Sequence, residues 1–202
     1  MDLANPSLNR CIQDDLVIKK RDLCVRDCNL ERVLKTAEIL GIDEIGAEYD
    51  GKARENVIYR LNTQPHLVSN YPYLVVSDKI EDLSSPELDL FVVRDYAKVK
   101  HIIKKRVRTR IGLEVSLADI RTANGSSVGK WFEHLRGLYK LCQSIKCQFI
   151  LSSGAKSPRE MIPARCFESM LELCEVRPER YWQELEEWLK IKLGKRCYTD
   201  VE

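Results

Sequence analysis

The sequence predicts a single α/β domain whose parallel strands close into a compact barrel. Two consecutive units, beginning at residues 111–117 and 148–154, each contain a short apolar run, a polar loop and a helical pattern. Buried parallel strands have such apolar runs, and the chain returns to the sheet through a crossover that is usually a helix. The alternation continues along the 202-residue chain without a linker or a fixed repeat, which favours one domain.

The first half of the chain contains five expected strands joined by short connections. Asn29 is a suitable cap for a helix with apolar residues at helical spacing, and Gly41 ends that helix. A brief helical turn is expected at residues 80–83. The expected strands lie at residues 22–26, 44–49, 56–62, 73–77 and 88–93.

The second half adds the two strands named above and four expected helices. The helix at 97–105 presents lysines outward, and the helix at 128–145 carries an apolar and aromatic stripe typical of core packing. A further helix starts near Pro163, and the last one, at 178–193, is expected to dock against the barrel. About seven or eight strands, with no Gly-rich turn after the first, favour a barrel over an open nucleotide-binding sheet.

The composition is that of a soluble globular protein, with 44% apolar and 32% charged residues. No apolar run approaches the ~18 residues of a membrane span. Residues 1–20 form a leader that lacks the apolar stretch of a signal peptide, and residues 178–202 form a C-terminal helix and tail. We therefore expect one barrel domain over residues 1–202, a cytoplasmic location and no membrane partner.

Eight cysteines are expected to be mainly buried free thiols, because they lie within core-like patterns. Four disulfides are the first alternative. A zinc site is the second, with Cys24 and Cys28 or Cys142 and Cys147 as ligands. Neither spacing matches a zinc knuckle, and no histidine nearby completes a ligand set.

Positive charge is concentrated in residues 94–110, which hold eight basic residues and one acid. This segment carries +7 and the rest of the chain −5, within a total of +2. A solvated helix face is the simplest explanation, but such a face usually mixes both signs. We favour a polyanion-binding surface, and an acidic protein is another possible partner. The candidate binding residues are Lys104, Lys105, Arg106, Arg108 and Arg110.

The loop after the last strand offers a second group of candidate anion contacts. Ser152, Ser153 and Gly154 follow a strand, where backbone amides and hydroxyls meet phosphate oxygens in many proteins. Lys156 and Arg159 add positive charge. A capped turn without a binding role explains the same residues equally well.

No catalytic residue or metal ligand is expected. The three histidines do not pair with another histidine or an acid, and neither a phosphate-binding loop nor a serine-nucleophile motif is present. Glu114 lies within an expected strand, and we expect it to have a structural hydrogen-bonding role. The alternative is a metal-dependent phosphoesterase that uses Asp22, Glu48 and Glu114 at strand ends.

Residues 20–193 resemble the archaeal ribonuclease P protein component 3 family, relatives of the eukaryotic thirty-kilodalton subunit of ribonucleases P and MRP. The most specific part is Phe-Ile-Leu-Ser-Ser-Gly-Ala at 149–155, followed by Pro158, Arg159 and Glu160 and a helix. The apolar runs at 22–26, 88–93 and 111–117 match more weakly.

The resemblance implies a TIM-like barrel of the polymerase and histidinol phosphatase class that has no nuclease site of its own. In the holoenzyme the RNA subunit cleaves precursor tRNA at its 5′ end, with Mg²⁺ expected at the RNA and no cofactor bound by this chain. The expected partners are the ribonuclease P RNA, precursor tRNA and a small ferredoxin-like protein subunit. Lysines and arginines would neutralise phosphates and stabilise the catalytic RNA.

Overall fold

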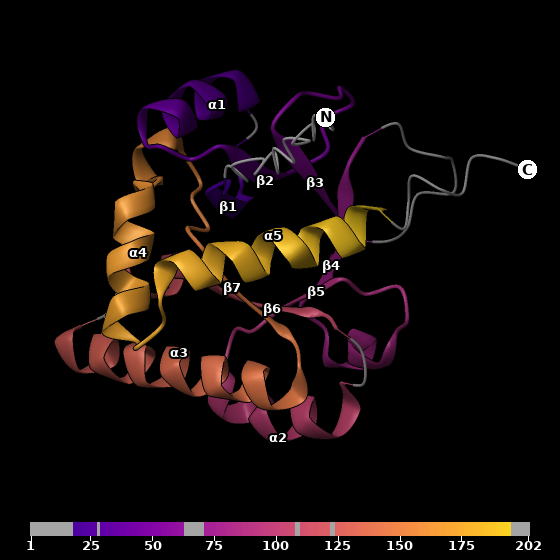
Figure 1. The fold of residues 1–202 in the computed structure, drawn as a ribbon, viewed down its shortest axis with the longest axis vertical. Coiled ribbons are helices and arrows are strands. Elements are labelled where there is room, and N and C mark those ends of the chain that lie inside the picture. The colour runs from indigo at the N-terminus through magenta and orange to yellow at the C-terminus, as the bar shows by residue number, and fades with distance from the viewer. Residues whose placement is uncertain (1–17, 28, 63–70, 108–109, 122–123, 195–202) are drawn as a thin grey trace, which may run out of the picture.

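The computed structural model describes residues 18–27, 29–62, 71–107, 110–121 and 124–194. These residues form one parallel sheet that curls into a barrel nearly closed on itself, with helices around it (Figure 1). The fold predicted from the sequence is therefore confirmed. The leader at 1–17 and the tail at 195–202 lie outside the described residues.

The described strands follow one another around the sheet in chain order, and every neighbouring pair is parallel. The strands are β1 (Arg21–Val25), β2 (Glu44–Glu48), β3 (Val57–Leu61), β4 (Tyr73–Ser77), β5 (Leu90–Val92), β6 (Gly112–Ser116) and β7 (Gln148–Ser152). The helices are α1 (Leu30–Ile39), α2 (Tyr96–Arg106), α3 (Gly125–Ile145), α4 (Ala164–Leu173) and α5 (Pro178–Gly194). Short 3₁₀ turns occur at η1 (Ile80–Ser84), η2 (Leu117–Ile120) and η3 (Pro158–Glu160).

Side-chain caps determine where three of the helices begin. The Asn29 side chain accepts a hydrogen bond from the Arg32 amide at 3.2 Å, as expected for the cap of α1. Asp95 caps α2 in the same way, and Asn124 caps α3. Because Asn124 takes this role, α3 begins three residues earlier than the predicted position 128.

Strand β5 is shorter than predicted, with three residues instead of the six at 88–93. The residue before it, Asp89, turns its carboxylate to the amide of Val75 and accepts a hydrogen bond at 2.8 Å. A side chain thus replaces a backbone acceptor at the start of this strand. Pro163 was expected in the first turn of a helix, but it is the residue immediately before α4, which begins at Ala164.

The barrel closes where β1 meets β7. Val25 and Ala155 form a single parallel bridge, and the Arg26 amide donates to the Ala155 carbonyl at 2.7 Å. Below this bridge the Ser153 amide donates to Oδ1 of Asp22 at 2.9 Å. A buried carboxylate therefore supplements a short backbone ladder at the seam.

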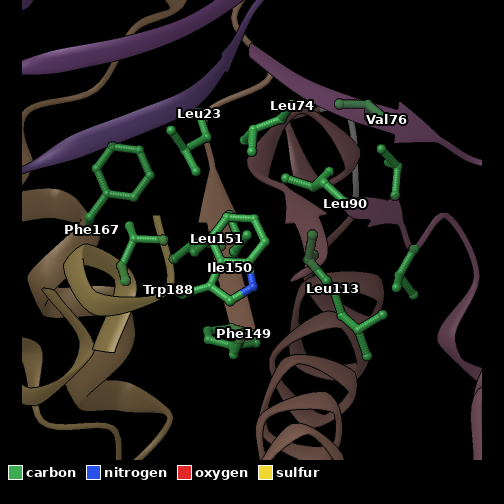
Figure 2. Packing of buried hydrophobic residues seen from close by; sticks show 14 of the residues in the cluster. Leu23, Leu74, Val76, Leu90, Leu113, Phe149, Ile150, Leu151, Phe167 and Trp188 are labelled. Carbon is green, nitrogen blue, oxygen red and sulfur yellow. The ribbon is translucent and has the colours of Figure 1, made fainter. Parts of the chain in front are cut away.

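Helix α5 covers the amino end of the barrel, as predicted for a docking terminal helix. Glu186 pairs with Arg21 at the start of β1, and Lys192 lies 3.4 Å from Asp89 at the start of β5. The Trp188 indole donates to the Arg110 carbonyl at 3.0 Å, just before β6. Figure 2 shows its ring among the apolar side chains of the barrel core.

Four tyrosines cover the outer face of β2, β3 and β4, where residues 49–56 connect two strands without a helix. Tyr59 is fully buried, and its ring lies 5.0 Å from those of Tyr49 and Tyr71. Tyr73 packs at the edge of Tyr71. These rings shield the sheet from water as a crossover helix would.

Among the described cysteines, Cys166 is exposed, and burial raises the pKa of four others. The buried thiols are Cys24, Cys142, Cys147 and Cys174. Cys28 of the zinc alternative lies outside the described residues. None of the described helices is long and apolar enough to cross a membrane.

Candidate nucleic-acid interface

The last turn of α2 carries Lys104, Lys105 and Arg106, and all three side chains are exposed. Cations are favourable at this position because the carboxyl end of a helix has partial negative charge. Arg106 is held by a hydrogen bond to the Ile80 carbonyl at 3.3 Å. We call Lys104, Lys105, Arg106 and the exposed Arg110 the basic cluster.

The basic cluster lies toward the amino end of the barrel. Arg110 lies just before the amino end of β6, separated from it by Ile111. Helix α2 runs back from the carboxyl end of β5 to this end of the barrel. Arg108, the remaining candidate of this group, lies outside the described residues.

Lys156 and Arg159 are exposed but lie at the carboxyl end of the barrel, after β7. The register pairs Gly112 with Gln148 at one end and Ser116 with Ser152 at the other. A strand of this length spans about 17 Å. The structure therefore does not bring the two groups of candidate residues together.

The serines of the second candidate group are not exposed to an anion. Ser152 and Ser153 are fully buried. The Ser153 hydroxyl accepts from the Ala155 amide at 3.0 Å, while its own amide donates to Asp22. The expectation of phosphate contacts through these two serines is wrong, because both are fully buried and the polar groups of Ser153 bond within the barrel seam.

Gly154 connects β7 to Ala155 in a backbone conformation that favours glycine. Its φ of +60° lies in the left-handed region, and a Cβ there would stand 2.0 Å from the Ser116 hydroxyl oxygen. The loop that follows is fixed by Glu160, which accepts from the Lys156 amide at 2.9 Å and from Arg121 at 2.6 Å. This geometry corresponds to the capped turn considered as an alternative.

A cavity of about 410 Å³ opens at the carboxyl end of the barrel, which we call the mouth. Arg60 reaches into it from β3 and forms two hydrogen bonds with Glu114 of β6, at 2.9 and 2.7 Å. Its guanidinium also donates to the Leu23 carbonyl. The structural role expected for Glu114 is confirmed, whereas Arg60 was not found from the sequence because nothing near it indicates a partner 54 residues away.

The three carboxylates of the phosphoesterase alternative have different environments. Glu114 is neutralised by Arg60, and Glu48 is exposed at the rim of the mouth. Burial raises the pKa of Asp22 to about 6 despite its hydrogen bonds to the Ser153 and Cys24 amides. Among the described residues, no group of three or more His, Cys, Asp or Glu side chains is placed to hold a metal ion.

These features define the class of the molecule: a parallel α/β barrel whose mouth contains a buried ion pair and whose basic cluster lies toward the opposite end. No protein-family model matches the sequence, and no curated protein matches it at a significant level.

The fold is similar to that of a chain in a solved structure. The chain is similar to a chain in the cryo-EM structure of archaeal Ribonuclease P with mature tRNA, with a TM-score of 0.59 and 11% sequence identity. The likeness covers 90% of this chain and 93% of that chain. At this level of identity the likeness establishes the fold.

Proposed function

We propose that this chain is a protein subunit of ribonuclease P, the ribonucleoprotein that cleaves precursor tRNA to generate the mature 5′ end. The observation that supports the proposal most strongly is the likeness of fold to a chain of the archaeal Ribonuclease P structure, over nearly the whole of both chains. The Ser-Ser-Gly-Ala and Pro-Arg-Glu segments between residues 152 and 160 point to the same family.

In this proposal the chain binds the catalytic RNA and stabilises its fold without performing cleavage. Cations of the basic cluster neutralise closely spaced phosphates and release condensed counterions, which gives binding its salt dependence. Recognition is then of backbone and shape, because the grooves of A-form RNA expose little sequence information. The Mg²⁺ ions belong to the RNA, and a small ferredoxin-like protein is the expected partner subunit.

Lys156 and Arg159 belong to this proposal as a second, separate contact. They lie beyond β7 at the other end of the barrel, so one short RNA helix does not have to meet both groups. A large folded RNA, or the precursor tRNA, can reach both ends.

Reconstitution tests the proposed function. Cleavage of a precursor tRNA by an archaeal ribonuclease P RNA is measured at limiting Mg²⁺ with the small ferredoxin-like subunit, with and without this chain. We expect faster cleavage, or a lower Mg²⁺ requirement, when the chain is added. Unchanged cleavage together with no shift of the RNA in a gel would contradict the proposal.

A metal-dependent phosphoesterase is the second candidate, because the mouth lies where barrel enzymes place their active sites. Asp22, Glu48 and Glu114 are its potential ligands. The test is turnover of a generic phosphoester by the isolated chain with Mn²⁺ or Zn²⁺. Robust turnover that is lost in Glu48→Gln would favour the enzyme.

A further inference from the structure

A groove of about 520 Å³ lies between α2 and α3, and the sequence does not reveal it because its two sides are distant in the chain. The helices pack side by side at the lower edge of the molecule as drawn in Figure 1. Among the described residues that line the groove, Glu133 is the only acid. The polar lining otherwise comes from Tyr96, Lys100 and His101 of α2 and from His134, Arg136 and Lys140 of α3.

The packing of Tyr96 against Gly137 sets the geometry of the groove. A Cβ at Gly137 would stand 3.0 Å from the Tyr96 hydroxyl oxygen, so the missing side chain permits this close approach. The first turn of α2 thus meets the middle of α3. Both helices run from the mouth toward the amino end, since each connects one parallel strand to the next.

Lysines and an arginine line both sides of the groove. Lys100 lies one helical turn after Tyr96, and Lys140 lies one turn after Arg136. Lys104 continues the α2 side by a further turn and belongs to the basic cluster. Along α2, the basic cluster therefore begins one helical turn beyond the lysine that lines the groove.

The two lysines are available to a ligand. Within the described part of the chain neither Lys100 nor Lys140 makes an ion pair, whereas Lys19, Lys20 and Arg21 each pair with a glutamate. The Lys100 ammonium lies 5.8 Å from the centre of the Tyr96 ring, and Lys140 is exposed.

The Arg136 guanidinium already makes one hydrogen bond within the protein, which it donates to the Leu173 carbonyl at 3.0 Å. With Lys100, Lys140 and Glu133, the groove carries a net positive charge before either histidine is protonated.

We propose that the groove between α2 and α3 binds the sugar-phosphate backbone of the RNA, with Lys100 and Lys140 as phosphate contacts. This inference rests on the proposed function and extends the interface from α2 onto α3. An RNA backbone suits the groove better than an acidic protein does. Protein interfaces have apolar cores, and here the floor consists mainly of charged and polar side chains with Ala97 and Gly137.

The test uses Lys100→Glu/Lys140→Glu in the full chain, with an in vitro transcribed archaeal ribonuclease P RNA as the probe. Affinity is measured by gel shift at several salt concentrations. We expect affinity to fall about tenfold or more and the salt slope to decrease by roughly one to two units, since each phosphate contact contributes slightly under one. Lys100→Arg/Lys140→Arg is expected to retain both values.

The matched control is Arg32→Glu/Lys35→Glu on α1, which changes charge equally at exposed residues outside the groove and the basic cluster. Circular dichroism verifies that each variant folds, and Lys100→Gln/Lys140→Gln replaces the glutamate variant if that one does not. We expect the control to bind RNA as the wild type does.

Two results would overturn the inference. One is a groove variant that binds RNA with the affinity and salt slope of the control. The other is unchanged RNA binding with loss of binding to polyglutamate, which assigns the groove to an acidic protein. If the wild-type chain itself binds no RNA, the proposed function fails together with the inference, and this outcome is distinct from the first two.

Discussion

Arg60 of β3 and Glu114 of β6 face each other across the interior of the barrel and join strands that are not neighbours in the sheet. The carboxylate is fully buried, and the arginine side chain is 11% exposed. Their paired hydrogen bonds place a planar, bidentate ion pair below the mouth. A charged pair thus occupies part of the space in which barrel enzymes bind substrates.

Replacing only one member of this pair is expected to destabilise the fold. Arg60→Met leaves the Glu114 carboxylate buried without a counter-charge, which costs about 3–5 kcal/mol of unfolding free energy. Adding Glu114→Gln removes the buried charge and should restore much of the loss. Urea unfolding at neutral pH measures both variants. A single variant within about 1 kcal/mol of the wild type would contradict this assignment.

The buried Asp22 predicts a pH-dependent stability. Its pKa is raised from 3.8 to about 6, mainly by burial, so the folded state holds its proton more tightly than the unfolded state. The contribution of Asp22 is fully present below about pH 4 and is lost as the pH rises through about 6. It amounts to roughly 3 kcal/mol in order of magnitude.

The comparison that isolates this effect is wild type against Asp22→Asn, because other carboxylates titrate in the same range. Asp50 and Asp95 have lowered pKa values and act in the opposite direction. We expect the difference in unfolding free energy between the two proteins to change between pH 4 and 6. A constant difference over this range would show that Asp22 does not titrate there.

Gly112 and Gly129 should respond in opposite ways to replacement by alanine. At Gly112 a Cβ would stand 2.5 Å from Ile150 Cδ1 and 3.0 Å from the Trp188 ring, so overpacking is expected to cost about 1–3 kcal/mol. At Gly129, within α3, nothing lies within 4 Å, and alanine should stabilise the helix by about 0.5–1 kcal/mol. Thermal unfolding distinguishes the two, and equal shifts would be inconsistent with α5 packing against β6.

The separation of the two basic groups predicts additive effects on RNA binding. Lys104→Glu/Lys105→Glu and Lys156→Glu/Arg159→Glu should each weaken binding of the ribonuclease P RNA. Because the groups lie at opposite ends of the barrel, the combined variant should show the sum of the two effects within about 0.5 kcal/mol. Strong coupling in titrations at fixed salt would mean that both groups contact the same RNA element.

The cysteines are expected to differ in reactivity toward an alkylating reagent. Cys166 is exposed and should be modified in the native protein. The four buried thiols have raised pKa values and should react only after unfolding. Peptide mapping by mass spectrometry after a short exposure measures this directly. Rapid native modification of Cys142, which is completely buried, would contradict the packing of α3.

Local patterns were sufficient to predict most of the fold. Short apolar runs identified the strands, and the Asn29 cap and the stripe on α3 identified helices, since both signals depend on neighbours within a few turns. The starts of β5 and α3 were missed because Asp89 and Asn124 act through specific side-chain hydrogen bonds that periodicity does not encode.

The candidate site was predicted less completely than the fold. The exposed cations of α2 could be identified because they are consecutive in sequence and lack acidic neighbours. The cations on α3 could not be identified from the sequence, since Lys140 approaches α2 only after two crossovers have folded onto the sheet. The role of Ser153 was misjudged for the same reason, because its partner Asp22 is 131 residues away in the chain.

The sequence by itself determined that this is an α/β barrel with a concentrated positive segment, because hydrophobic periodicity and charge are properties of residues close together in the chain. Only the tertiary structure decided which cationic side chains are free of an ion pair and can therefore contact a ligand. Arg60 is neutralised by Glu114, whereas Lys100 and Lys140 face a groove without an ion pair in the described residues. Charge pairing depends on distances that only chain closure creates, and residues of the same type therefore differ in what they can bind.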